Sequence, residues 1–199
     1  MDALKSWLKR SVRGAAGPIG RGLAALGIRA DWVTLAGVVV AVPAALAFYR
    51  GAYLQAFGWL LASALCDLFD GAVARAGGGN GTKFGAALDS TLDRYGEGLV
   101  LAGITLGLAA RAAPEWLIGV SVLVGIGSFL VSYVRARSEG LGIPCEVGIL
   151  ERPERLLLLL LLALLGERSA PWILSILALL SHITFLQRLA VVRRGSRGA

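Results

Sequence analysis

Apolar residues fall in six runs along the chain, and the lengths of these runs predict helices that cross a lipid bilayer. The three longest runs contain no charged residue and cover residues 32–49, 116–134 and 170–186. A helix needs about 20 apolar residues to cross a hydrocarbon core about 30 Å thick. These three runs therefore predict membrane-spanning helices without help from their neighbours.

Three shorter runs cover residues 52–66, 98–110 and 156–165. As helices they would rise only about 15–22 Å, at about 1.5 Å per residue. They reach across a bilayer only if the charged turns beside them are helical too. The charged residues in those turns are Asp67, Asp70, Asp89, Asp93, Arg152 and Arg155. We therefore predict an all-α polytopic membrane protein with six transmembrane helices, in which these charges lie on the helices.

Residues 1–30 precede the first long run and are predicted to form an N-terminal juxtamembrane segment. A cleavable signal peptide is not expected, because the first long run begins only at Trp32. Apolar residues in this segment follow helical spacing opposite basic ones, which predicts an amphipathic helix in the membrane interface; a disordered basic tail is the alternative. The apolar residues are Leu4, Trp7, Leu8 and Val12. No repeat or soluble domain is evident, so residues 1–199 are expected to form a single membrane domain.

The composition agrees with a membrane protein and adds an orientation. The chain is 56% hydrophobic, has a mean hydropathy of +0.71 and carries a formal net charge of +7. Most of its Lys and Arg residues lie before the first run, after the last, or in the second and fourth connections, and only Arg50, Arg111 and Arg168 fall on the other side. The positive-inside rule then places both termini and the charged connections in the cytoplasm, at the cell membrane. The basic charge reports topology, and no nucleic-acid binding is expected.

Four of the six aspartates gather at the ends of two predicted helices that are consecutive in the chain. Asp67 and Asp70 are three residues apart, and Asp89 and Asp93 are four apart, so each pair shares one helix face. The short connection over residues 76–84 turns the second helix back against the first. We therefore expect the four carboxylates to converge.

Four ionised carboxylates in a partly desolvated site repel one another and require positive charge nearby. Arg75 alone is too little for an ordinary salt-bridged site. Hard divalent cations supply the charge and prefer oxygen ligands, and neither Cys nor His is arranged among these positions to favour zinc. The sequence thus predicts that Asp67, Asp70, Asp89 and Asp93 bind Mg²⁺ or Mn²⁺.

The pattern Asp67-x2-Asp70-Gly71-x2-Ala74-Arg75-x9-Gly85-x3-Asp89-x3-Asp93 resembles the signature of the CDP-alcohol phosphatidyltransferase family. It departs from that signature by about one extra residue between the arginine and the second glycine, in the glycine-rich stretch 77–81. The resemblance implies a site with two Mg²⁺ or Mn²⁺ ions in which the first three aspartates hold the metals and Asp93 is a ligand or the catalytic general base. It also implies a homodimer.

The resemblance further implies which residues bind the CDP-lipid. They are Thr34, Asp67, Gly71, Ala74, Arg75 and Thr82. For the two threonines an alternative remains open, because a threonine can also cap a helix or bond back to the carbonyl of the preceding turn.

Two later segments, residues 132–139 and 151–156, together with residues 187–189, are similar to segments of the bacterial phosphatidylinositol-phosphate synthases within that family. Arg135, Arg155 and Arg188 come from three predicted inner helix ends, which suits a pocket for a doubly charged phosphate. With Arg137 they form the predicted acceptor phosphate site. The alternative is that these arginines anchor helices at the lipid headgroups or form surface bridges with nearby glutamates. The stretch 142–148 differs from that subgroup.

The expected activity is metal-dependent transfer of a phosphatidyl group from CDP-diacylglycerol, or an archaeal-type CDP-lipid, to inositol 1-phosphate with release of CMP. Glycerol 3-phosphate, inositol or another polar alcohol remains open as the acceptor. A non-enzymatic carrier of divalent metal is the alternative of another class, and it would spread its carboxylates through several spans. The presence of all four aspartates argues against an inactive scaffold.

Overall fold

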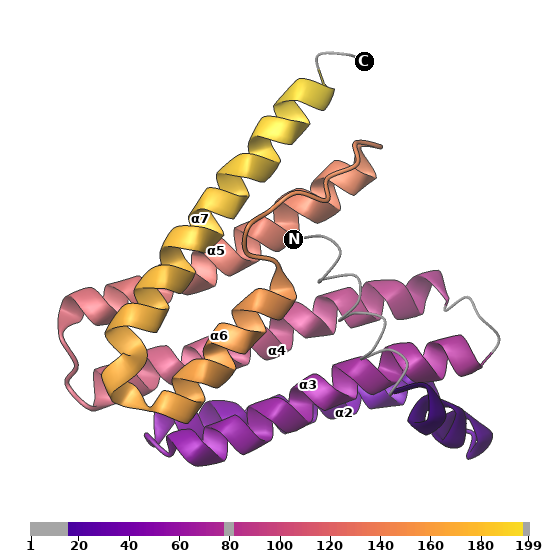
Figure 1. Ribbon diagram of the computed structural model, residues 1–199, viewed down its shortest axis with the longest axis horizontal. Helices are drawn as coiled ribbons and strands as arrows, with labels where there is room; N and C mark the ends of the chain where they lie inside the picture. Colours follow the sequence, from indigo (N-terminus) through magenta and orange to yellow (C-terminus); the bar gives the residue numbers. More distant parts are fainter. Residues whose placement is uncertain (1–15, 78–81, 197–199) are drawn as a thin grey trace. The chain divides into compact units, whose positions relative to one another are not determined.

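The computed structural model describes residues 16–77 and 82–196, and within these ranges the protein is helical and contains no β-strand (Figure 1). The all-α prediction is confirmed. The helices cover residues 16–25, α2 (Ala30–Tyr49), α3 (Tyr53–Ala76), α4 (Lys83–Ala110), α5 (Glu115–Gly140), α6 (Arg152–Leu165) and α7 (Ala170–Gly195), with a 3-10 turn η1 (Glu167–Ser169) before α7. The amphipathic pattern of Leu4, Trp7, Leu8 and Val12 lies outside the described residues.

Four helical stretches of the described chain are long and apolar enough to cross a membrane. They are Ala30–Tyr49, Tyr53–Ala76, Glu115–Gly140 and Glu167–Gly195. Helix α4 is 28 residues long but carries a run of charged residues in its first half, and α6 is only 14 residues long. The charged turns do belong to the helices, as expected, because α3 continues past Asp70, α4 begins before Asp89 and α6 begins at Arg152.

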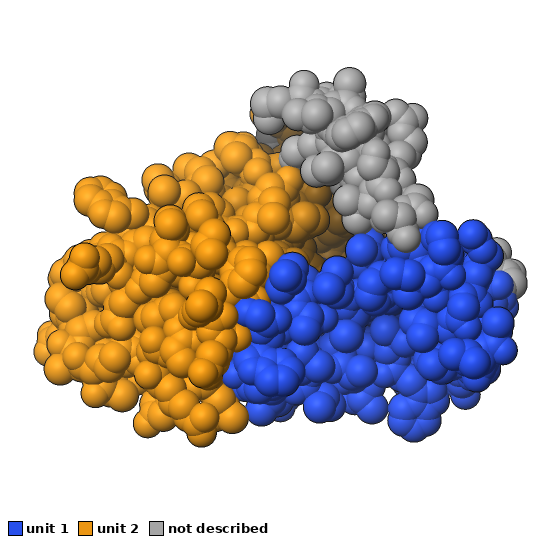
Figure 2. Space-filling view, turned by 60° about the horizontal axis from the view of Figure 1, so that its bottom comes forward, with its two compact units in different colours: residues 1–44, 58–99 blue, residues 45–57, 100–199 orange. Residues whose placement is uncertain are grey.

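The chain divides into two compact units, residues 1–44 with 58–99 and residues 45–57 with 100–199 (Figure 2). In the first unit, glycines bring helices into close contact. A Cβ atom on Gly20 would lie 2.6 Å from the carbonyl carbon of Ala72, so the helix over residues 16–25 packs directly on α3. A Cβ atom on Gly37 would lie 3.1 Å from the Cβ of Cys66, so α2 also packs closely on α3. Any side chain at Gly20 would separate these helices.

In the second unit, glycines also allow close helix packing, between α2 and α4 and between α5 and α7. Gly103 of α4 faces the backbone carbonyl of Ala45, and a Cβ atom on Gly107 would lie 2.7 Å from the carbonyl oxygen of Phe48. On the other crossing, a Cβ atom on Gly127 of α5 would lie 2.8 Å from the Cβ of Ser181 on α7. In both places helix backbones approach more closely than larger residues permit.

Arg111, which follows α4, forms hydrogen bonds to the ends of three other helical elements in the second unit. Its Nε donates to the Oε2 of Glu167 at 2.8 Å, its Nη1 to the carbonyl of Tyr49 at 2.7 Å, and its Nη2 to the hydroxyl of Tyr53 at 3.3 Å. The last carbonyls of a helix have no partner within the helix. Arg111 supplies one for α2 and joins that end to α3 and η1.

Candidate active site

A cavity of about 190 Å³ lies in the first unit among α2, α3 and α4. Its acidic lining residues are Asp31, Asp70 and Asp89. The remaining lining residues carry only hydroxyl groups or very small side chains, and they include Thr34, Gly71, Ala74, Thr82 and Gly85. Four of the six positions predicted to bind the CDP-lipid therefore line one cavity, together with two of the four predicted metal ligands.

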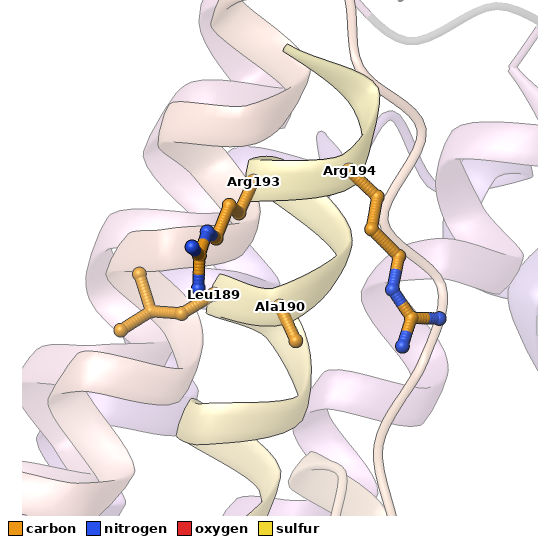
Figure 3. A pocket seen from close by; sticks show the side chains of 4 residues that line it. All are labelled: Leu189, Ala190, Arg193 and Arg194. Atoms are coloured by element: carbon orange, nitrogen blue, oxygen red, sulfur yellow. The ribbon is translucent and has the colours of Figure 1, made fainter. Parts of the chain in front are cut away.

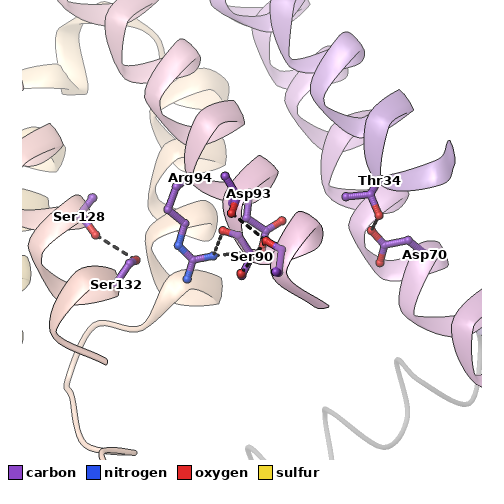
Figure 4. A network of polar contacts seen from close by, with 9 residues as sticks. Thr34, Asp70, Ser90, Asp93, Arg94, Ser128 and Ser132 are labelled. Atoms are coloured by element: carbon purple, nitrogen blue, oxygen red, sulfur yellow. Dashed lines mark hydrogen bonds and ion pairs between the residues drawn. The ribbon is translucent and has the colours of Figure 1, made fainter. Parts of the chain in front are cut away.

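Asp70 is the most enclosed acid of this cavity. Only 6% of the residue is exposed, and its Oδ2 accepts a hydrogen bond of 2.8 Å from the Thr34 hydroxyl (Figure 4). The same hydroxyl lies 3.2 Å from the carbonyl of Ala30, one turn earlier on α2. Thr34 is thus both back-bonded to its own helix, the alternative foreseen from the sequence, and in contact with a predicted metal ligand.

Thr82 shapes the entrance to α4. Its Oγ1 accepts a hydrogen bond of 2.9 Å from the backbone N–H of Gly85, which is the arrangement of an N-cap residue. A Cβ atom on Gly85 would lie 3.1 Å from that Oγ1 and 3.2 Å from the Oδ1 of Asp31. Thr82 is therefore a helix cap that also lines the cavity. Because Gly85 has no side chain, the space between Thr82 and Asp31 stays open.

The other two predicted metal ligands, Asp67 and Asp93, are not among the residues that line this cavity. The Oδ1 of Asp67 lies 3.6 Å from where a Cβ atom on Gly37 would be, so this carboxylate rests against α2. Asp93 is buried, and its Oδ2 lies 3.2 Å from the Nη1 of Arg94. Among the described residues no group of three or more His, Cys, Asp or Glu side chains is arranged as a metal site. Convergence of all four carboxylates stays a prediction, and the cavity holds two of them.

The charge count made from the sequence was wrong at one point, because it set only Arg75 against the four aspartates. Arg94 pairs with Asp93, while the exposed Arg75 folds back so that a Cβ atom on Gly71 would lie 3.2 Å from its Nη1. In the described part of the chain, no lysine or arginine forms an ion pair with Asp70 or Asp89. The two cavity acids Asp70 and Asp89 therefore lack a cationic partner among the described residues.

Sequence reasoning missed three residues of this site: Asp31, Gly37 and Arg94. Asp31 lies three residues before Thr34 in the first turn of α2, so helical spacing placed it on the same face. Its Oδ2 also pairs with the Nη2 of Arg29 at 3.1 Å. No comparable signal pointed to Gly37, because its role depends on how α2 packs on α3.

The predicted acceptor arginines lie in the second unit. Arg188 is 2% exposed, its Nε donates to the carbonyl of Val147 at 2.8 Å and its Nη1 to the carbonyl of Val131 at 2.7 Å. Arg188 therefore links the segment that precedes α6 to helix α5. Arg188 also lies within electrostatic range of Arg135 and Arg155.

The remaining acceptor arginines differ in exposure. Arg155 is 1% exposed, which excludes a simple surface bridge, whereas the Nε of Arg135 donates to the Oε1 of Glu139 at 2.9 Å on the surface of α5. Arg137 is exposed on the same helix. Glu151 caps α6 in a capping box with Glu154, so these two glutamates serve the start of the helix.

Comparison with known proteins identifies the family. Residues 28–194 match the CDP-alcohol phosphatidyltransferase family model. The archaetidylinositol phosphate synthase of Methanothermobacter thermautotrophicus is 40% identical over 171 residues, which are 84% of each chain. The phosphatidylinositol phosphate synthase of Mycolicibacterium smegmatis is 39% identical over 185 residues, covering 88% of this chain and 82% of the relative.

Solved structures agree. The crystal structure of the Mycobacterium tuberculosis phosphatidylinositol phosphate synthase with CDP-DAG bound superposes with a TM-score of 0.82 at 35% identity, covering 89% of this chain and 92% of that one. The structure of the same enzyme in complex with manganese and citrate gives the same TM-score of 0.82 and covers 88% of that chain. Five of the eight signature residues line one cavity, and together with these likenesses they show that the protein is a transferase of phospholipid synthesis with membrane helices that belongs to the CDP-alcohol phosphatidyltransferase family.

Proposed function

We propose that this enzyme transfers a phosphatidyl-type group from CDP-diacylglycerol, or an archaeal-type CDP-lipid, to inositol 1-phosphate and releases CMP. The observation that carries the donor assignment is the cavity in which Thr34, Asp70, Gly71, Ala74 and Thr82 meet. Small side chains leave room for a nucleotide. The relatives named above, one of them with CDP-DAG bound, support the same donor class.

The acceptor assignment rests on positive charge in the second unit. Arg188 and Arg155 are almost fully buried, and Arg188 lies within electrostatic range of Arg155 and Arg135 and of one acid, Glu151. Buried like charges repel, so a group of arginines is stabilised by a bound anion. A phosphate ester on the acceptor supplies that anion and accepts the forked hydrogen bonds of guanidinium groups. Arg137 would contribute from the exposed side of α5.

The cavity of the first unit fits a divalent cation by the chemistry of its donors. Asp70 is buried, the neutral Thr34 hydroxyl donates a hydrogen bond to it in the cavity, and Asp89 lines the same space. Mg²⁺ and Mn²⁺ favour carboxylate oxygens. The residues that would hold two such ions are Asp67, Asp70, Asp89 and Asp93. When bound, these ions supply the charge that binds the diphosphate and stabilises the departing CMP.

The chain's own residues account for the remaining steps. Thr34 holds Asp70 in place, Gly71 and Gly85 leave space for the nucleotide, and Asp93 accepts the proton of the acceptor hydroxyl. The acceptor oxygen then forms a bond to the lipid-side phosphorus as the bond from that phosphorus to the CMP oxygen breaks. The electron pair of the broken bond leaves with CMP.

We also propose that all six helices from α2 to α7 cross the cell membrane, with both termini and the active site in the cytoplasm, and that the enzyme works as a homodimer. The end of α7 supports this orientation. Arg193 and Arg194 leave opposite sides of the helix beside a shallow space of about 450 Å³ (Figure 3). Exposed arginines at a helix end are typical of the cytoplasmic face.

The acceptor is tested with purified enzyme, CDP-diacylglycerol, Mn²⁺ and a panel of alcohols. CMP release with inositol 1-phosphate, and little with inositol, serine or glycerol 3-phosphate, is the expected result. Turnover with free inositol or glycerol 3-phosphate, and none with inositol 1-phosphate, would remove the acceptor assignment while keeping the family chemistry.

Arg155→Lys is expected to raise the KM for inositol 1-phosphate by about 10–100-fold, since a charge-assisted hydrogen bond contributes about 1.5–3 kcal/mol and lysine lacks the guanidinium fork. The KM for the CDP-lipid should stay within about twofold, because none of the residues lining the donor cavity changes. Steady-state CMP release at varied concentrations of each substrate measures both.

The exposed Arg168 of η1 provides the matched control. Arg168→Lys should change neither KM. An Arg155→Lys variant that raises the two KM values equally would contradict the assignment of Arg155 to the acceptor pocket.

A further inference from the structure

The shallow space of about 450 Å³ at the end of α7 combines positive charge with an apolar floor (Figure 3). Its lining residues, here called the α7 site, are Leu189, Ala190, Arg193 and Arg194, and all four are exposed. Residues four apart are neighbours on a helix surface, so each arginine lies beside one of the two apolar residues. Both arginine side chains extend back along the helix, and their guanidinium groups flank Ala190 (Figure 3).

The two guanidinium groups of the α7 site are open to an anion from outside the chain. Within residues 16–77 and 82–196, no acid forms an ion pair with Arg193 or Arg194, and neither side chain donates a hydrogen bond. Two like charges at one small site repel each other. A phosphate group relieves this repulsion and accepts forked hydrogen bonds from guanidinium groups.

An exposed apolar row leads along α7 to this site. Trp172, Leu179 and Leu186 are 75%, 62% and 60% exposed and follow one another at intervals of seven residues, and Arg193 continues the row at the same interval. Seven residues make nearly two full turns of an α-helix, so the row follows one line on its surface. From Trp172 to Arg193 the helix rises about 32 Å, close to the thickness of a hydrocarbon core of about 30 Å. Since tryptophan is typical of the membrane interface, Arg193 lies at the depth of the lipid phosphates of the opposite leaflet.

Contacts within the second unit hold the end of α7 in place. A Cβ atom on Gly195 would lie 2.8 Å from the Cγ2 of Ile143 in the segment after α5. One turn before the site, Arg188 donates hydrogen bonds to the carbonyls of Val131 and Val147. The α7 site thus belongs to a packed part of the fold. A ligand that binds there only in the folded state raises the stability of the protein, so thermal unfolding reports its binding.

We propose that the α7 site binds the phosphate of an anionic phospholipid, whose acyl chain lies along Leu186 and Leu179. A free phosphate would match only the two guanidinium groups, whereas a phospholipid also matches the apolar row that ends at them. In a zwitterionic lipid the cationic part of the headgroup offsets the phosphate, so a lipid of net negative charge fits best. The site shares no lining residue with the cavity that contains Asp70, and the proposal depends on neither the donor nor the acceptor of the transfer reaction.

The test titrates the purified full-length protein, in an uncharged detergent, with phosphatidylglycerol or phosphatidylcholine. Phosphatidylglycerol is expected to raise the thermal midpoint at lower concentrations than phosphatidylcholine. In Arg193→Gln/Arg194→Gln, the phosphatidylglycerol concentration for half of this rise should increase about 10–30-fold, because each arginine near a membrane surface contributes roughly a fivefold preference for anionic lipid. Arg193→Lys/Arg194→Lys should lose less, since lysine keeps the charge without the guanidinium fork.

Arg50→Gln/Arg168→Gln is the matched control, because it removes the same charge from two other exposed positions, and it should titrate as the wild type does. Equal effects of the two lipids on the wild type, an unchanged titration of Arg193→Gln/Arg194→Gln, or the same loss in the control would overturn the proposal. So would inorganic phosphate that protects as strongly as phosphatidylglycerol, which would indicate an anion site without a lipid. Elution of Arg193→Gln/Arg194→Gln as a monomer, where the wild type elutes as a dimer, would instead assign this face to a second copy of the chain. The titration requires no turnover, so failure of the proposed transfer reaction would leave its result unaffected.

Discussion

Asp93→Asn is expected to reduce kcat by at least about 10²–10⁴-fold, the range that a positioned general base contributes. An amide has nearly the shape of the carboxylate but does not accept the acceptor's proton at neutral pH. Metal-dependent binding of the CDP-lipid should largely persist, because the family resemblance assigns the metals chiefly to Asp67, Asp70 and Asp89 and the proton transfer to Asp93. CMP release measures the first effect, and equilibrium binding of a fluorescent CDP-lipid in Mn²⁺ measures the second.

Asp67→Asn serves as the comparison, since it removes a predicted metal ligand. It should weaken CDP-lipid binding in Mn²⁺ as well as turnover. Loss of lipid binding to the same degree in both variants would show that Asp93 is chiefly a metal ligand, and normal turnover by Asp93→Asn would exclude it as the base.

Gly103→Leu is expected to abolish the native fold or lower the thermal midpoint by more than any other single change considered. The Cα of Gly103 on α4 faces the backbone carbonyl of Ala45 on α2, and backbone atoms cannot turn aside as a side chain can. Overpacking commonly costs about 1–3 kcal/mol, and occasionally more, where side chains can rearrange. Thermal unfolding followed by circular dichroism, with size-exclusion chromatography in detergent, measures the loss.

Gly98→Leu on the same helix is the matched control. A Cβ atom there meets no other atom within 4 Å, and Gly98 is exposed. Leucine also forms helices more readily than glycine by up to about 1 kcal/mol, so the midpoint should hold or rise. Equal midpoints for the two variants would show that α2 and α4 separate at Gly103 at little cost.

Helix positions were predictable because they depend on local pattern. Long apolar runs fixed α2, α5 and α7, and the need to lengthen the short runs placed Asp67, Asp70, Asp89 and Asp93 on α3 and α4. The family resemblance also predicted that Thr34, Gly71, Ala74 and Thr82 belong to one CDP-lipid site, and these four residues line one cavity, whereas Asp67 and Arg75 of the same predicted set do not. These features follow from periodicity and from the family resemblance.

Side-chain directions were not predictable in the same way, because tertiary packing decides them. The position of Asp67 against Gly37 depends on how closely α2 and α3 approach. The fold-back of Arg94 onto Ser90 depends on the rotamer of a long side chain. Charge counting along the sequence could not reveal that Asp93 already has a cationic neighbour while Asp70 lacks one.

Burial of the acceptor arginines was likewise beyond the sequence. Arginines near helix ends usually extend to the membrane surface, and Arg135 and Arg137 follow that rule. Arg188 departs from it because two backbone carbonyls, of Val131 and Val147, surround its guanidinium. Both carbonyls come from distant parts of the chain, and only the fold brings them together.

The contact of Gly20 with Ala72 sets a limit on how far the protein can be trimmed from its amino end. Ala72 and Val73 are each 3% exposed and lie two and three residues after Asp70 on α3. A deletion that ends before residue 16 keeps the helix over residues 16–25. A deletion that extends past Gly20 exposes Ala72 and Val73 on α3, the helix that also carries the cavity acid Asp70. The helix over residues 16–25 therefore supports α3, and affinity tags or fusion partners should be attached before it.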